Sequence, residues 1–271
     1  METITLTFGD CAENHRGMQT IGEMSQTGLD LEDLKKTMAW FVKKGKKCEL
    51  VDLKKDMDAD PAYVLIVRDG CSALVNPDEL LAEQTELAWD THAFMYGRVV
   101  NKKARHNICY SDFDQEPDYE VGKGTVVNFL KLPLLSKIRE KLGRITGPKL
   151  TGLQCEGNRY YDVKKTYIGF HGDTERRIVV AVRLGADFPI HYQWYKDSKP
   201  VGELFTAILK HGDMYFMSSK AVGFDWKKKK TFTLRHAAGL VKNVIKPVKE
   251  KVEKVEKVTK KKELDFEIID E

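Results

Sequence analysis

Residues 169–176 read Gly-Phe-His-Gly-Asp-Thr-Glu-Arg, and this stretch does most to decide the fold and the chemistry. It places the imidazole of His171 two residues before the carboxylate of Asp173. On extended backbone, side chains at this spacing point to the same side. Such a pair supplies part of a 2-His-1-carboxylate facial triad, which holds non-haem Fe(II) and leaves coordination positions open. His171 and Asp173 are therefore candidate metal ligands, with iron as the candidate metal.

The flanking sequence extends this pattern. Residues 156–161 read Glu-Gly-Asn-Arg-Tyr-Tyr, and residues 178–186 read Ile-Val-Val-Ala-Val-Arg-Leu-Gly-Ala, an apolar run that indicates a buried strand. An Asn-x-Tyr segment, then His-x-Asp-x-Glu, then an apolar strand ending near Leu-Gly-Ala resembles the AlkB-type branch of the 2-oxoglutarate/Fe(II) dioxygenases. The resemblance covers roughly residues 95 to 240.

This resemblance implies an α+β protein whose core is a double-stranded β-helix, a jelly roll that holds a metal at its open mouth. Short strands separated by Gly and Pro between residues 96 and 239 also favour a sandwich or barrel over a helical bundle. We therefore expect a dioxygenase-like domain over residues 96–239. An N-terminal α/β region over residues 1–95 precedes it, and a charged tail over residues 240–271 follows it.

Local patterns predict further elements. Residues 3–8 and 62–68 have the composition of strands, while residues 30–42 and 77–89 carry apolar residues at helical spacing. Residues 133–142 begin with Pro and place apolar residues on one face, which also predicts a helix. Helices and strands are therefore expected to mix from the start of the chain.

The third metal ligand has several candidates. His236 is favoured, because it is followed by small residues as at the distal site of the family. His211 lies in a second His-Gly-Asp and is the alternative, whereas His191 is expected to face the core or a substrate. A different alignment makes Arg235 a ligand of the cofactor carboxylate and leaves Asp225 as the nearest substitute metal ligand. Both alignments cannot hold, because neighbouring residues of a strand point to opposite faces.

The resemblance also implies 2-oxoglutarate as co-substrate. Asn158 and Tyr160 would donate hydrogen bonds to its carboxylates, although a polar strand end with a core tyrosine is the alternative. A buried carboxylate needs a cationic partner. Arg235 and Lys246 are the candidates for that role.

The activity implied is hydroxylation or oxidative demethylation, with an alkylated nucleic-acid base as the candidate substrate. Four aromatic residues could stack on a flipped base or simply pack in the core: Phe188, Tyr192, Trp194 and Tyr195. Two alternatives stay open, a non-catalytic AlkB-like binding or structural module and a hydroxylase of protein side chains.

Composition limits the partners and the cellular compartment that we expect for this protein. A net charge of +4 with 32% charged residues does not describe a strongly basic body. Five cysteines without a C-x-x-C spacing favour a reducing compartment, so the expected location is intracellular, cytoplasmic or nuclear. No apolar run approaches the roughly 18 residues of a membrane span. A membrane is therefore not expected as a partner.

Two polar segments are candidates for ligand contact. Residues 242–262 contain nine lysines and three glutamates, and this tail is expected to be disordered or a single exposed helix. It could contact nucleic acid, or it could be a solvated appendage. The segment 12–19 is dense in polar groups and could be a ligand loop or an ordinary connection.

Overall fold

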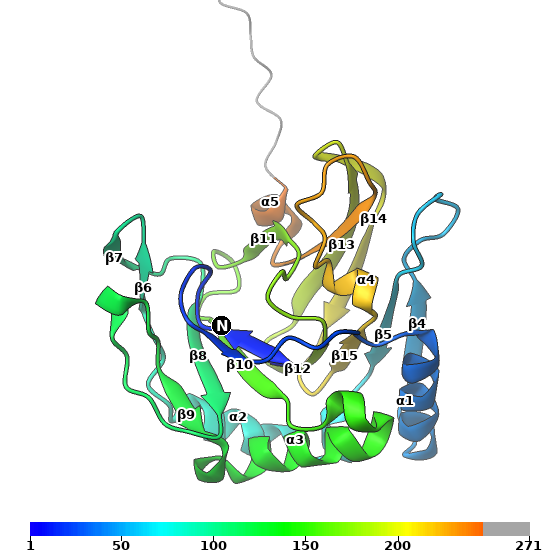
Figure 1. Cartoon of the computed structure of the whole chain (residues 1–271). Coiled ribbons are helices and arrows are strands. Elements are labelled where there is room, and N and C mark those ends of the chain that lie inside the picture. Colours follow the sequence, from blue (N-terminus) through cyan, green and yellow to red (C-terminus); the bar gives the residue numbers. More distant parts are fainter. Residues whose placement is uncertain (246–271) are drawn as a thin grey trace, which may run out of the picture.

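A computed structural model describes residues 1–245 of the 271-residue chain (Figure 1). The protein is a mixed α/β structure in which strands predominate and form several sheets. Within residues 1–245, no helix is both long and apolar enough to cross a membrane.

The strands are β1 (Thr3–Gly9), β2 (Cys11–Glu13), β3 (Thr20–Gly22), β4 (Cys48–Asp52), β5 (Tyr63–Val67), β6 (His92–Met95), β7 (Arg98–Asn101), β8 (His106–Ser111), β9 (Val126–Asn128), β10 (Gln154–Tyr160), β11 (Ile168–His171), β12 (Val179–Gly185), β13 (Phe188–Lys196), β14 (Lys199–Leu209), β15 (Met214–Met217) and β16 (Thr233–Ala238). The α-helices are α1 (Leu31–Lys43), α2 (Pro77–Thr85), α3 (Pro133–Thr146), α4 (Ser219–Val222) and α5 (Val241–Val244). Short 3-10 turns lie at Gly70–Ala73, Tyr119–Val121, Phe129–Lys131 and Pro148–Leu150.

The larger sheet has eight strands in the order β4-β5-β15-β12-β1-β10-β8-β9. β1 is the first strand of the chain, yet it lies inside this sheet and pairs antiparallel with β10 on one side and β12 on the other. The N-terminal strand therefore joins two strands that lie about 150 to 180 residues further along the sequence.

Helices α1, α2 and α3 cover one face of the larger sheet (Figure 1). Helix α1 begins at a capping box formed by Asp30 and Asp33, and it buries Leu34 and Phe41. Helix α3 starts with Pro133 and buries three apolar residues spaced three or four apart. The alternate residues of β1, β12 and β15 that face these helices form the main hydrophobic core.

The smaller sheet has the order β11-β16-β13-β14 and lies across from the helices, on the other side of the larger sheet (Figure 1). A second apolar cluster joins the two sheets, with Val179 and Tyr215 from the larger sheet and Ile190 and Leu234 from the smaller one. Both faces of β12 are covered, one by the helices and one by the smaller sheet. This burial explains why its sequence is a nearly continuous apolar run.

The sequence boundary at residue 95 does not divide the molecule. β1, β4 and β5 belong to the same sheet as β10, β12 and β15, so the segment 1–95 completes the sheet of the segment 96–239. The local elements expected within residues 1–95 are present, but their periodicity did not show which strands they would join. Of the expected tail, residues 240–245 include the short helix α5, and residues 246–271 lie outside the described residues.

Candidate metal centre

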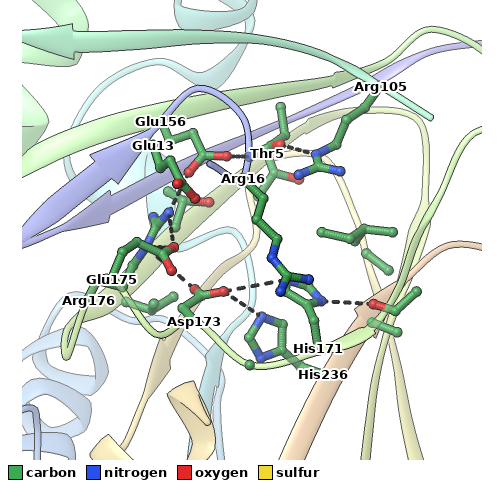
Figure 2. Close-up of a pocket in the computed structure, with 18 of the residues that line it drawn as sticks. Thr5, Glu13, Arg16, Arg105, Glu156, His171, Asp173, Glu175, Arg176 and His236 are labelled. Carbon is green, nitrogen blue, oxygen red and sulfur yellow. Dashed lines mark hydrogen bonds and ion pairs between the residues drawn. The ribbon is translucent and has the colours of Figure 1, made fainter. Parts of the chain in front are cut away.

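Three side chains meet at the end of the smaller sheet that faces the larger one: His171, Asp173 and His236. Each offers one ligand atom, and these atoms all lie within 4.8 Å of one another. Asp173 Oδ1 lies 3.4 Å from His171 Nε2 and 3.7 Å from His236 Nε2 (Figure 2). Two imidazole nitrogens and one carboxylate oxygen on one side of an open space make the donor set of a facial triad.

The strand pairing brings the three ligands together. His171 ends β11, and His236 is its direct partner on β16. Gly172 allows the turn to Asp173, since a Cβ at that position would collide with the backbone carbonyl of Gly223. The Asp173 amide then donates to the Val222 carbonyl at 3.0 Å. The backbone therefore fixes where the carboxylate projects.

The two histidines present ring nitrogens to the carboxylate. His171 Nδ1 donates to the Gly169 carbonyl at 2.8 Å, so Nε2, which faces Asp173, is the ring nitrogen available to a metal. Burial, His171 and Arg176 lower the pKa of His236 well below its ordinary value. A neutral imidazole at neutral pH is the form that binds a metal.

Arg176 orients the carboxylate from behind. Its Nε lies 3.5 Å from Asp173 Oδ2, so the two oxygens of Asp173 face in different directions, one to the histidines and one to the guanidinium. Arg176 is buried and is also paired with Glu156 and Glu175. Although burial opposes its charge, these carboxylates raise the pKa of Arg176 well above its usual value. The guanidinium therefore stays charged and holds Asp173 in place.

The ligands open into a cavity of about 580 Å³ between the two sheets. It is large enough for a metal and a small organic molecule. The lining consists of Thr5, Thr7, Glu13, His15, Arg16, Gly17, Arg105, Glu156, Asn158, Tyr160, Ile168, Gly169, His171, Gly172, Asp173, Thr174, Glu175, Arg176, Val179, Arg183, Ile190, Tyr215, Met217, Trp226, Lys227, His236, Ala237 and Ala238.

Arg183 is a buried cation in this lining. It lies on β12, has no exposed surface, and donates through Nη1 to the Thr5 hydroxyl. Its Nε and Nη2 are buried without a hydrogen-bond partner, and no carboxylate within residues 1–245 lies within ion-pair distance of it. Burial lowers the pKa of Arg183, yet a guanidinium stays protonated in proteins. A buried charge without a counter-charge is costly, so this position favours an anionic ligand.

The segment 12–19, a candidate ligand loop in the sequence, lies over the cavity and contributes Glu13, His15 and Arg16 to its wall. Asn14 anchors it from behind, since its Nδ2 donates to Asp90 at 2.7 Å and its Oδ1 accepts from Lys102 at 2.6 Å. The loop is therefore held in position by buried polar contacts.

Asn158 and Tyr160 both line the cavity from β10. The Asn158 amide is already engaged, because its oxygen accepts from Arg105 and Asn107 and its nitrogen donates to Glu156 at 3.0 Å. Their positions suit contact with a ligand. The amide of Asn158 would have to exchange one of these partners to make it.

The other sequence candidates for the metal and cofactor lie elsewhere. His211 accepts from the Gly185 amide at 2.9 Å, and His191 bonds Thr206 and the Gly239 carbonyl. Asp225 pairs with Lys220 at 2.9 Å. Arg235 points away from His236, as alternation requires, and its guanidinium lies 3.9 Å from the Tyr195 ring centroid. Lys246 falls outside the described residues.

The four aromatic residues proposed to stack on a base are absent from the cavity lining. Phe188, Tyr192 and Trp194 are at most 2% exposed and belong to apolar clusters. Tyr195 packs on Arg235 outside the cavity. The core interpretation of these residues is the one that fits the structure.

Two features of the cavity were not predicted from the sequence. Arg183 was visible as a lone arginine inside the apolar run 178–186, which is a signal for a buried charge with a specific task. Thr5 and Thr7 gave no comparable signal, because their place in the cavity depends on the distant pairing of β1 with β10 and β12.

The fold and the site describe a mixed α/β protein with a His-Asp-His cluster at the mouth between two sheets. No known family model matches the sequence. The protein is 50% identical over 249 residues to the "Uncharacterized protein R156" of Acanthamoeba polyphaga mimivirus, a match that covers 90% of its own length and 98% of that protein. It belongs to the same family as this viral protein.

Proposed function

We propose that the protein is a non-haem Fe(II)/2-oxoglutarate-dependent dioxygenase. The observation that carries the proposal is the presence, in one cavity, of a His171-Asp173-His236 cluster and the buried, unpaired guanidinium of Arg183. A metal triad alone would also suit zinc. An anion site beside the triad suits a co-substrate that binds the metal at one end and carries a free carboxylate at the other.

The strand order supports a double-stranded β-helix as the finer description of the fold. β10 to β16 alternate between the two sheets, apart from the β13–β14 hairpin, and β11 and β16 meet at the ligands. In this interpretation the usual strand order is rearranged, since β1 fills the sheet position between β10 and β12. The sequence offered Arg235 and Lys246 as candidates for the co-substrate's cation. The proposal assigns that role to Arg183 on β12, beside Thr5 of β1.

The assigned roles follow from position. His171, Asp173 and His236 would hold Fe(II), Arg176 orients Asp173, and Arg183 would pair with the free carboxylate of 2-oxoglutarate. When bound, the metal and co-substrate supply the oxidation: one atom of O2 enters a C–H bond of the substrate, and the other converts 2-oxoglutarate into succinate with loss of CO2.

The structure bears differently on the three alternatives: a non-catalytic module, an enzyme acting on alkylated bases and a hydroxylase of protein side chains. A non-catalytic module need not keep a complete ligand set, whereas His236 pairs directly with His171 and completes the candidate cluster. The alkylated base implied by the resemblance finds less support, because the four aromatic residues pack away from the cavity. A hydroxylase of protein side chains or of small molecules is compatible with the same machinery.

Uncoupled turnover tests this proposal without knowledge of the substrate. The full-length protein is incubated with Fe(II), ascorbate and 2-oxoglutarate in air, and succinate is measured. We expect succinate formation that depends on Fe(II) and falls to background in Asp173→Ala. Absence of Fe(II)-dependent succinate, together with no binding of 2-oxoglutarate to the metal-loaded protein, would overturn the assignment.

A further inference from the structure

The part of the cavity that faces solvent carries charges of both signs. Five cationic side chains and four carboxylates line the cavity as a whole, so it is close to balanced. A wall built for a polyanion would be uniformly basic. The aromatic side chains of the lining are Tyr160, Tyr215 and Trp226, and the two tyrosines are buried. The cavity therefore offers few faces on which a nucleobase could stack.

Five of these charges lack an ionic partner within residues 1–245: Arg183, assigned above to 2-oxoglutarate, the exposed Arg16 and Lys227, and the half-buried Glu13 and Arg105. Glu13 accepts a hydrogen bond from the Gly17 amide at 2.9 Å, and no cation in residues 1–245 lies within ion-pair distance of it. Arg105 uses Nε on Asn158, and its remaining guanidinium nitrogens have no carboxylate within that distance among the same residues. By contrast, Arg176 is fully paired with acidic neighbours. Glu13 and Arg105 could therefore each form an ion pair with an oppositely charged group of a ligand.

These two residues approach the cavity from different elements. Glu13 ends β2, and Arg105 immediately precedes β8. In Figure 2 their side chains lie on the wall away from the metal ligands, with Glu13 beside Glu156 and Arg105 beyond Thr5. Burial, reinforced by Glu175 and Glu156, raises the pKa of Glu13 to about 7. A cationic group placed against this carboxylate would favour its ionised form.

We infer that the substrate is a free amino acid, with its ammonium group held by Glu13, its carboxylate held by Arg105, and its side chain directed to the metal centre. The inference rests on the proposed function for the reaction itself. A zwitterion would pair with both half-buried charges that 2-oxoglutarate leaves unpaired, Glu13 and Arg105, and it would leave the cavity's overall charge unchanged. The reaction would be hydroxylation of a C–H bond in the side chain of the amino acid, with the O2 and 2-oxoglutarate balance given above.

The test begins with binding, so that it does not depend on turnover. Calorimetry on the full-length protein, loaded with Fe(II) and 2-oxoglutarate without oxygen, is run against each of the twenty standard L-amino acids. We expect at least one to bind, and the same one to raise succinate formation in air. Its N-acetyl and its carboxamide derivatives should each bind roughly 10- to 100-fold more weakly, since each loses a charge-assisted contact.

Two variants assign the ends of the ligand. In Arg105→Met the intact amino acid should bind roughly 10- to 100-fold more weakly, while its carboxamide should bind this variant and the unmodified protein alike. In Glu13→Gln the same pattern is expected for the N-acetyl derivative. Equal losses for intact and blocked compounds would show that these residues do not contact the charged ends.

Other results separate the two proposals. If an amino acid binds and no succinate forms, the substrate site stands and the dioxygenase assignment fails. If Fe(II)-dependent succinate forms but no amino acid binds, the amino-acid inference is overturned. Stimulation by a single-stranded oligonucleotide carrying an N-methylated base, with no amino acid bound, would instead assign the nucleic-acid substrate.

Discussion

Replacement of Arg183 by Met should leave the stability of the ligand-free protein nearly unchanged and sharply lower its affinity for 2-oxoglutarate. The guanidinium is fully buried, and two of its nitrogens have no hydrogen-bond partner. In the absence of ligand it therefore carries a desolvation cost that its contact with Thr5 offsets in part. Met fills much of the same space without a charge.

The burial of Arg183 sets the expected changes in unfolding free energy and in 2-oxoglutarate affinity. Exchange of buried charges for apolar residues commonly stabilises a protein by about 1–4 kcal/mol, and loss of the contact with Thr5 opposes this by about 1.5–3 kcal/mol. These ranges largely offset each other, at about −2 to +2.5 kcal/mol net, so we expect Arg183→Met without ligand to be about as stable as the unmodified protein. Removal of one partner of a buried ion pair costs about 3–5 kcal/mol, which corresponds to a roughly 100- to 4,000-fold loss of 2-oxoglutarate affinity.

The assay pairs thermal unfolding of the metal-free protein with anaerobic calorimetry of 2-oxoglutarate binding to the Fe(II)-loaded protein. Arg235→Met is the matched control, because its guanidinium is stacked on Tyr195 outside the cavity. This control should keep its affinity for 2-oxoglutarate. If Arg183→Met binds 2-oxoglutarate normally, or if Arg235→Met loses that affinity instead, the reasoning about the buried guanidinium is refuted.

Three further predictions concern the metal ligands. Arg176→Met should lower Fe(II) affinity roughly 10- to 100-fold, because Asp173 loses its orienting partner, and competition with a chelator would detect this. Gly172→Ala should weaken Fe(II) binding in the same assay, since the new Cβ collides with a neighbouring backbone carbonyl; unchanged binding would show that this turn tolerates a shift. The lowered pKa of His236 means that the unfolded protein takes up this proton more readily than the folded protein. The unfolding free energy of the metal-free protein should therefore fall as pH drops below about 6.5, and denaturant titrations of His236→Gln should show a smaller fall.

The candidate His171-Asp173-His236 cluster could be predicted from the sequence for a local reason. His171 and Asp173 share one turn, and His236 was favoured over His211 by the small residues that follow it. The structure adds the direct pairing of His171 with His236, which depends on the register between β11 and β16. Periodicity shows that strands exist but does not show which strands pair.

The same limit explains why the sequence did not show the sheet shared by residues 1–95 and 96–239, and why it did not point to Arg183. The place of β1 between β10 and β12 depends on contacts across most of the sequence, and no local pattern specifies such contacts. The sequence therefore offered only Lys246, which follows the distal histidine, and Arg235, from the alternative alignment, as the cation. Arg183 came to the cavity through the alternation of β12, whose other face packs on the helices.

We propose that His171, Asp173 and His236 form one metal site. Its most direct test is anaerobic Fe(II) titration of the full-length protein and of three variants, His171→Ala, His236→Ala and His211→Ala, with metal measured after removal of free ions. One Fe(II) per molecule is expected for the unmodified protein and for His211→Ala, because His211 bonds the Gly185 amide away from the cavity. The other two variants should retain almost none. Retention of iron by both His171→Ala and His236→Ala, or its loss in His211→Ala, would contradict the account.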